Sequence, residues 1–511
     1  MSDIMRHLES KGSPELALAA VSGLDVYPRS IVDSGDAIYF LGCRDNVHRL
    51  GVLRKGRSAG AFELAWQDVT LDGRDYALGI GEENHANAAA LREALPFTAP
   101  IRVGTKRSAG LGDRLGIATP GHLRAMRRSK GIVPVLAQQS IREMERTERT
   151  PEDVMDAATW GVFQEGWRAG FGADADHLKT PEDIDYCAAS GFVWYTFDPR
   201  DHVDNDAEED AVDVLRKKYE ALPWADLDAT PASTREQYVG KEWDLEGYRL
   251  GLTEEDLLRA ACKYGKALAH LASMYRHLVD VMGERPFEVE VSVDETETPT
   301  KPHEHLYIAS ELKRLGLEWT SLAPRYIGRF EKGVDYIGDL AAFEETFAQH
   351  VAIAKALGPY KLSLHSGSDK FSIYPIAARL AGELVHLKTA GTSYLEALRA
   401  VARVDPALFR EILAFAIEHY EEDKASYHVS ADVNKVIRPD AVSDEELPDV
   451  LDQFDTREAL HVTFGSVLTL RDAEGRSVFK DRLYAVLEAN ETEHYAALES
   501  HIVKHVTPFS D

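Results

Sequence analysis

The fold of this chain is decided by four segments, VEVSVDET (289–296), SLAPRYIG (321–328), KLSLHSGSDKF (361–371) and VHLKTAGTSYLEAL (385–398). Each begins as a short β-type run and ends in polar, chemically capable residues. In alternating β/α chains, ligands bind at the carboxyl ends of the parallel strands. We therefore expect these polar side chains to converge on one site, and the chain to be an enzyme.

The alternation extends outward from these segments over most of the chain. The strands that we predict lie at 101–104, 132–137, 173–178, 192–197, 287–293, 318–323, 360–365 and 384–389. Helical patterns lie between most of them. Eight such units fit a closed (β/α)₈ barrel of the TIM type, although an open doubly wound sheet gives similar signals. We predict an α/β protein built on the barrel.

Three regions follow from this pattern. Residues 1–98 are predicted to form an N-terminal α+β module, and residues 99–400 the catalytic barrel. An acidic insertion at 199–250 is too long for an ordinary βα loop and is placed at the rim of the site. Residues 401–511 are predicted to form a mostly helical C-terminal extension packed on the barrel.

Composition limits the function. The 511 residues carry a net charge of −28, which argues against nucleic acid or an anionic membrane as a partner and favours a small molecule. Three scattered cysteines form neither a disulfide framework nor a thiolate zinc motif. The N-terminus does not resemble a signal peptide, and no apolar run approaches the roughly 20 residues needed to cross a bilayer. A cytoplasmic protein is expected, and a homo-oligomer is left open.

Two strand ends carry a histidine and a lysine. Strict alternation along 172–180 puts His177 and Lys179 on one face and the neighbouring aspartates on the other. His386 and Lys388 repeat this spacing in the last segment. A ligand or acid/base histidine beside a cation is the functional interpretation. The competing interpretation of His177 and Lys179 is a solvent-exposed polar loop.

Carboxylates alternate with apolar residues in FEVEVSVDET (287–296). Glu290 and Asp294 then point into the barrel, where a divalent metal or a proton-transfer site would need them, unless the segment is an edge strand with one wet face. GLGDRLG (110–116) lacks the spacing of a dinucleotide fingerprint, so no NAD site is predicted. His501 and His505 are expected on an exposed helix face.

In their order along the chain, these motifs resemble the tagaturonate epimerase family. The resemblance rests on GADADHLKT (172–180), the VDET strand end, LAPRYIG with FEKGVDYIGDL (330–340), SLHSGSDKF and HLKTAGTSYLEAL, supported by QQSIREMERTERTPEDVM (138–155), TFDP (196–199) and LHVTFGSVL (460–468). It covers roughly residue 100 to the C-terminus. It implies a metal-dependent isomerase of carbohydrate metabolism that inverts carbon 4 of a hexuronate, interconverting tagaturonate and fructuronate.

Chemistry narrows the mechanism that the resemblance implies. The hydrogen on carbon 4 is not alpha to the carbon-2 ketone, so simple deprotonation cannot epimerise that carbon. Transient oxidation by a nicotinamide, or retro-aldol cleavage between carbons 3 and 4 followed by re-addition, can do so. Because no dinucleotide site is predicted, the retro-aldol route is preferred, with a divalent cation stabilising the enediolate.

Site roles are assigned on strand-end position and on this chemistry. The predicted metal ligands are His177, Glu290, His365 and His386. Their imidazoles suit zinc, nickel or manganese better than magnesium. The predicted catalytic groups are Asp294 as general base, Glu295 as the alternative base, and Lys179 or Lys388 for developing oxyanion charge. The predicted substrate-binding groups are Arg325, Lys370, Ser366 and Ser368 for the carboxylate, and Gln139, Ser140 and Thr196 for the hydroxyls.

Several alternatives remain at this stage. A class II type aldolase or an aldose–ketose isomerase acting on a sugar acid would use the same metal and enediolate. A lysine Schiff base would replace the metal altogether. A non-catalytic sugar-acid binding protein is a third class, but it does not require so many acid and base residues at strand ends.

Overall fold

The computed structural model describes residues 2–10, 12–57, 60–71, 73–245 and 247–511. Residues 1, 11, 58, 59 and 72 of the predicted N-terminal module, and residue 246 of the predicted insertion, lie outside the described residues.

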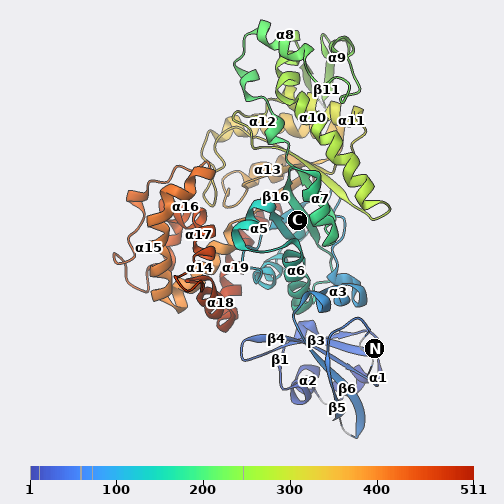
Figure 1. Ribbon diagram of the computed structural model, residues 1–511, viewed down its shortest axis with the longest axis vertical. Coiled ribbons are helices and arrows are strands. Elements are labelled where there is room, and N and C mark those ends of the chain that lie inside the picture. The colour runs from blue at the N-terminus through green and yellow to red at the C-terminus, as the bar shows by residue number, and fades with distance from the viewer. Residues whose placement is uncertain (1, 11, 58–59, 72, 246) are drawn as a thin grey trace.

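Eight of the described strands form a closed parallel barrel at the centre of the molecule (Figure 1). In chain order they are β7 (Ser108–Leu111), β8 (Val133–Ser140), β9 (Gly172–Leu178), β10 (Trp194–Phe197), β13 (Glu288–Val293), β14 (Ser321–Pro324), β15 (Lys361–Leu364) and β16 (Val385–Thr389). Pairing of β16 with β7 closes the ring. The predicted TIM-type barrel is confirmed.

The first predicted strand, 101–104, is wrong, because β7 lies at Ser108–Leu111. The backbone N–H groups of Val103 and Gly104 donate instead to the buried Glu288 carboxylate, at 2.7 and 2.6 Å. The small residues of β7 gave no apolar run for the pattern to detect. Its position depends on β16 and β8, which pair with it on either side.

Helices surround the barrel. They are α4 (Thr119–Met126), α5 (Ile141–Thr147), α6 (Pro151–Glu165), α7 (Pro181–Ala189), α10 (Glu254–Met282), α11 (Pro302–Arg314), α12 (Leu340–Leu357), α13 (Tyr374–Ala381) and α14 (Thr392–Val404). Thr150, Thr180 and Thr253 begin three of them with capping boxes, each satisfying N-terminal backbone donors. The valines of β13 belong to the apolar core, so its polar residues occupy the other face of the strand.

The region after β10 extends away from the barrel, at the top of Figure 1. It contains α8 (Val212–Glu220), α9 (Pro231–Tyr238) and a two-stranded sheet of β11 (Glu242–Leu245) and β12 (Tyr248–Gly251). Helix α8 packs on the long helix α10.

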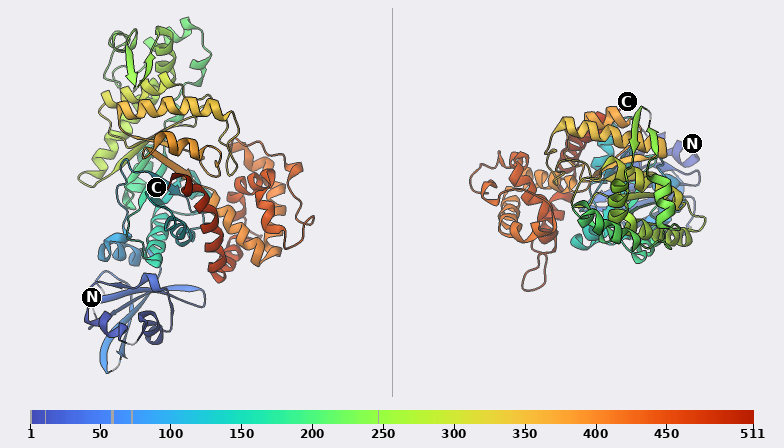
Figure 2. Two further views of the ribbon diagram at one scale, coloured as in Figure 1. Left: turned by 180° about the vertical axis from the view of Figure 1, so that it is seen from behind. Right: turned by 90° about the horizontal axis from the view of Figure 1, so that it is seen from above.

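An antiparallel sheet lies at the opposite end from this region, as the left view of Figure 2 also shows. Its strands are β1 (Asp25–Val26), β2 (Val32–Asp33), β3 (Ala37–Arg44), β4 (Val47–Arg54), β5 (Ala65–Leu71) and β6 (Arg74–Glu82). Helices α1 (Asp3–Glu9), α2 (Pro14–Ser22) and α3 (His85–Ala94) accompany it.

The C-terminal helices lie beside the barrel (Figure 1). They are α15 (Pro406–Asp423), α16 (Phe454–Val462), α17 (Phe464–Thr469), α18 (Lys480–Ala489) and α19 (Glu491–Val506). Helix α19 packs against α4 and α14, which ties this extension to the barrel wall. Within the described ranges, no helix combines the length and the apolar character that a membrane span requires.

Candidate active site

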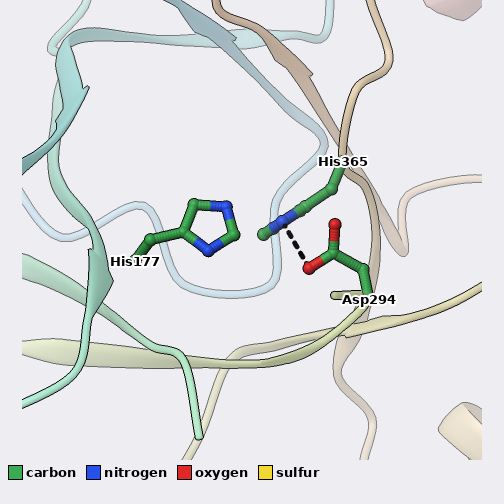
Figure 3. Close-up of side chains that lie close together, drawn as sticks. All are labelled: His177, Asp294 and His365. Carbon is green, nitrogen blue, oxygen red and sulfur yellow. Dashed lines mark ion pairs between the residues drawn. The ribbon is translucent and has the colours of Figure 1, made fainter. Parts of the chain in front are cut away.

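Three side chains converge at the mouth of the barrel: His177, Asp294 and His365 (Figure 3). They come from the end of β9 and from the loops that follow β13 and β15. One donor atom of each lies within 4.8 Å of the others. Two imidazoles and a carboxylate at this spacing can bind a divalent cation.

The backbone at the end of β9 is irregular, and this changes which way the side chains point. His177 has φ 53°, in the left-handed region that non-glycine residues seldom adopt, and the register between β9 and β10 shifts beside it. The strict alternation predicted for this strand is therefore wrong. Asp176 faces the barrel interior with His177, at 3.8 Å between Oδ1 and Nε2.

In each imidazole of the group, one nitrogen lies within 3.0 Å of a carboxylate that is outside the group. His177 Nδ1 lies 3.0 Å from Asp198 Oδ2, and His365 Nε2 lies 2.6 Å from Glu290 Oε1. His365 Nδ1 lies 3.2 Å from Asp294 Oδ1 but has no partner in hydrogen-bond geometry among the described residues. A carboxylate on the far nitrogen orients an imidazole and leaves its other nitrogen for a ligand.

The electrostatics of the group favour positive charge. Burial lowers the pKa of His365, but Asp294 and Glu290 outweigh it and raise the pKa to about 10. For His177, Asp176 and Asp198 likewise outweigh burial and raise the pKa. The same carboxylates would stabilise a metal cation at this position.

Beneath the group lies a buried network centred on Lys388. Its Nζ is 2.8 Å from Asp174, 2.6 Å from Asp176 and 2.9 Å from Glu290. Although burial lowers the pKa of Lys388, these three carboxylates raise it well above its ordinary value, so it stays an ammonium ion. Burial raises the pKa of Asp174 to about 7. Lys388 thus holds the carboxylate that contacts His365.

His386, a predicted metal ligand, lies one layer deeper in the barrel. It is fully buried, its Nδ1 is 2.8 Å from Ser108 Oγ, and its ring packs on Trp194 with centroids 4.7 Å apart. Burial lowers its pKa well below the ordinary value. The structure brings His177 and His365 together with Asp294, and does not bring His386 to them.

A cavity of about 370 Å³ opens above the group. Asp294, Glu295, Arg325, His365 and Ser366 line it, all of them predicted site residues. It is also lined by Arg142, Lys332, Tyr427, His428 and Ser430, which sequence analysis did not assign. Tyr427, His428 and Ser430 lie between α15 and α16, in the C-terminal extension. The C-terminal extension therefore contributes to the wall of the cavity.

Two predicted lysines lie away from the reaction centre. The Lys179 side chain is 37% exposed and pairs with Asp201 at 2.9 Å. Lys370 is fully buried and donates to backbone carbonyls of the loop after β14 and of Ser368, so it anchors backbone and does not face the cavity. Ser368 is itself buried.

The residues predicted to contact hydroxyl groups have other partners. Ser140 caps α5 in a capping box with Glu143. Gln139 Oε1 accepts a hydrogen bond of 3.0 Å from Arg149. Thr196 donates to Asp174 at 2.7 Å and accepts from Lys388, so it belongs to the buried network.

The expectation of an exposed His501 and His505 is wrong, because both are buried where α19 meets the barrel. His501 Nε2 is 2.5 Å from Asp369 Oδ1, and the Asp369 N–H donates to His505 Nε2 at 2.9 Å. Arg457 pairs with the same carboxylate at 3.1 Å. These atoms can form a second His/Asp group, but their hydrogen bonds already satisfy one another. Helical spacing could not reveal that this face is covered.

Asp198 and Arg200 were also missed by sequence analysis. Asp198 supports His177, and Arg200 pairs with both Asp198 and Glu295. The available signal was position, because DPR (198–200) directly follows the predicted fourth strand. Lys332 had no such signal, since it lies eight residues beyond the end of β14.

Comparison with known proteins gives the family. A family model described as tagaturonate epimerase matches residues 27–509. The chain belongs to this family. A Thermotoga maritima protein named tagaturonate/fructuronate epimerase is 45% identical over 489 residues, which cover 95% of this chain and 96% of the relative. The resemblance seen in the sequence is thus confirmed.

Solved structures of the family give the same fold. The native structure of the fructuronate-tagaturonate epimerase UxaE from Cohnella laeviribosi is 38% identical, with a TM-score of 0.89, and covers 97% of this chain and 99% of its own. A glycerol complex of that enzyme matches with the same identity and TM-score and covers 98% and 99%.

Proposed function

We propose that this protein is an isomerase that interconverts tagaturonate and fructuronate by inverting carbon 4. The names of its full-length relatives support the activity. The observation that carries the chemistry is the His177, Asp294 and His365 group beneath a cavity of about 370 Å³. Such a cavity is within the usual size of a small-molecule site. A cytoplasmic location fits a sugar-acid substrate.

The residues fit a divalent cation. His177, Asp294 and His365 would hold it, because one ligand atom of each lies within 4.8 Å of the others. The nitrogen of His365 that Glu290 leaves free is 3.2 Å from the Asp294 carboxylate. The donor set suits zinc, nickel or manganese. When bound, such a cation supplies Lewis-acid stabilisation of the enediolate charge. This ligand set differs from the one predicted from the sequence. Asp294 takes the place of His386, and Glu290 is the hydrogen-bond partner of His365 and not a ligand.

This assignment moves the general base to Glu295. Burial raises the pKa of Asp294, but His365 and His177 outweigh burial and lower it, so this carboxylate is ionised and committed to the ligand group. Glu295 lines the same cavity, held by Arg200 and lying 3.7 Å from Arg142. It is the alternative base considered from the sequence.

These residues then carry out retro-aldol cleavage between carbons 3 and 4, followed by re-addition. Glu295 accepts the proton of the carbon-4 hydroxyl as the bond between carbons 3 and 4 breaks. The bonding electrons move to carbon 3 and the carbon-2 oxygen, giving an enediolate and an aldehyde. The aldehyde turns its other face, carbon 3 adds to it, and Glu295 returns the proton. Lys388 acts through Glu290, by keeping that carboxylate against His365.

The test is proton NMR of tagaturonate with the purified protein in heavy water, with and without EDTA. We expect fructuronate to form without deuterium at carbon 4, and chelation to stop turnover until a divalent metal is restored. His365→Gln should abolish activity, whereas Lys179→Gln, at the partly exposed lysine directly after β9, should leave it unchanged.

Other results distinguish the rival functions. Net release of three-carbon products would indicate a class II type aldolase, and an aldose product would indicate an isomerase acting at carbons 1 and 2. Deuterium at carbon 4 would refute the retro-aldol route. Trapping of a lysine adduct by borohydride would favour a Schiff base over the metal.

A further inference from the structure

We propose that Lys332 binds the carboxylate of the substrate and that the C-terminal extension holds it in position to do so. This inference rests on the proposed function and deepens it, because it names the group that distinguishes a hexuronate from a neutral ketohexose. In tagaturonate the carboxylate is carbon 6, at the far end of the molecule from the ketone.

Two arginines that line the cavity already have a carboxylate partner. Arg142 forms an ion pair with Glu295 at 3.7 Å, and Arg329 forms one with Glu331 at 3.3 Å. Lys332 lines the same cavity, and within the described ranges its ammonium has neither an ion-pair partner within 4.0 Å nor a hydrogen bond. In a chain of net charge −28, a cation left without a carboxylate partner beside the reaction centre is the best place for a carboxylate ligand.

The surroundings of Lys332 support this assignment. Burial lowers its pKa, and Glu295 is the largest influence in the opposite direction. A half-buried ammonium that has lost water without gaining a protein carboxylate is stabilised when a ligand carboxylate arrives.

Arg325 is the other cavity cation without an ion pair among the described residues. Carbon 6 is separated from carbon 4 by one carbon, so a substrate whose carbon-4 hydroxyl meets Glu295 keeps its carboxylate in this cavity. Lys332 is favoured over Arg325 because it lines the cavity with Glu295, whose charge opposes the lowering of the Lys332 pKa by burial.

Buried cations anchor the backbone around Lys332. Lys370 donates to the carbonyls of Glu331, at 2.6 Å, and Val334. Arg457 Nε donates to the carbonyl of Gly333 at 2.7 Å. Three carbonyls flanking Lys332 are therefore fixed by side chains that do not reach the cavity.

The C-terminal extension provides much of this support. Arg457 lies on α16 and is fixed by Asp369 at 3.1 Å and Glu396 at 3.2 Å. Gly333 has φ 73°, and a Cβ there would lie 3.2 Å from Leu395 and 3.3 Å from His461, so the loop lies directly against α14 and α16. Arg457, held by Asp369 and Glu396, thus fixes the position of the loop that carries Lys332.

Ser430 of the C-terminal extension also holds the loop that carries Lys332. The Glu331 carboxylate accepts hydrogen bonds from the backbone N–H of Ser430, at 2.9 Å, and from its hydroxyl, at 2.7 Å. Ser430 also lines the cavity. The stretch of the extension that covers the cavity is therefore bonded to the residue next to Lys332.

The chemistry gives Lys332 a measurable second effect. When the bond between carbons 3 and 4 opens, carbon 6 belongs to the aldehyde fragment. Lys332 would hold that fragment while its aldehyde turns. Loss of the lysine should weaken substrate binding and also let three-carbon products escape. A general disturbance of the fold would instead lower turnover without changing the ratio of three-carbon products to fructuronate.

The experiment compares wild type, Lys332→Gln, Lys332→Arg and Lys179→Gln. For Lys332→Gln we expect the KM for tagaturonate to rise roughly 10- to 100-fold, the range of a charge-assisted hydrogen bond, with an increased share of three-carbon products. Lys332→Arg should restore most of the affinity, and Lys179→Gln should match wild type. The carboxamide of tagaturonate, a neutral probe, should inhibit wild type and Lys332→Gln equally.

The outcomes separate this inference from the proposed function. If wild type binds tagaturonate in calorimetry but does not convert it, the function fails, and weaker binding by Lys332→Gln would still support the lysine. If wild type produces fructuronate and Lys332→Gln has an unchanged KM and product ratio, the lysine assignment is overturned. A KM effect confined to Arg325→Gln would move the carboxylate to that residue. Thermal unfolding of every variant identifies any that misfold. If Lys332→Gln misfolds, the KM and product ratio of Lys332→Arg decide, and equal affinity of wild type for tagaturonate and its carboxamide would overturn the assignment.

Discussion

Replacement of Lys388 by methionine tests the buried network on which the site rests. The substitution keeps an unbranched side chain, one heavy atom shorter, and removes its charge. Three carboxylates that lie 2.6 to 2.9 Å from Nζ would lose their cation. Removing one partner of a buried ion pair costs about 3–5 kcal/mol, because the remaining charge is left without compensation.

The expected loss at neutral pH is therefore about 3–5 kcal/mol of unfolding free energy, a large part of the roughly 5–15 kcal/mol that stabilises an ordinary domain. Burial already raises the pKa of Asp174 to about 7, so proton uptake can replace part of the missing charge. The deficit should accordingly be smaller at pH 6 than at pH 8.

Lys361→Met is the matched control. Lys361 is also fully buried in the barrel, but its Nζ contacts the Ser108 hydroxyl at 2.9 Å and the Trp194 ring, with no carboxylate within 4.0 Å among the described residues. Its loss should cost only about 0.5–1.5 kcal/mol, the value of one hydrogen bond.

Urea unfolding followed by tryptophan fluorescence measures both variants, with the denaturant slope checked for constancy. Equal losses for the two lysines, or a Lys388→Met deficit that does not change with pH, would refute this account of the network. Loss of activity in Lys388→Met with an unchanged unfolding free energy would instead support a direct catalytic role.

Two further predictions concern residues outside the network. Asp198→Asn should weaken binding of zinc or manganese roughly 10- to 100-fold by calorimetry, because the imidazole of His177 loses the charge that orients it; unchanged affinity would show that Asp198 does not support a metal ligand. Burial lowers the pKa of His48, but hydrogen bonds to Glu491 and Glu83 outweigh burial and raise it to about 11. The stability that this link between the N-terminal sheet and α19 provides is fully present below about pH 6.5 and is lost as pH rises toward 11. The melting temperature of wild type should fall more steeply between pH 7 and 10 than that of His48→Gln, and parallel curves would contradict the assignment.

The sequence alone determined the barrel and much of its mouth. Alternating strand and helix patterns identified most of the strands, and the strand-end rule selected His177, Asp294 and His365, which the fold brings together. Local rules work here because side-chain direction in a regular strand, and capping at a helix start such as Thr253, depend on neighbouring residues.

Tertiary structure decided how deep each side chain lies in the barrel, which way it points and whether other elements cover it. Period-two alternation shows which side chains point into a barrel but not at which layer, so His386 could not be distinguished from His365 until the stagger between strands was fixed. The left-handed backbone at His177 reverses the local alternation. Lys332 reaches the cavity because Lys370 and Arg457, which are distant in sequence, bind the backbone carbonyls of the residues on either side of it. Such contacts depend on how whole elements pack, and no local pattern encodes them.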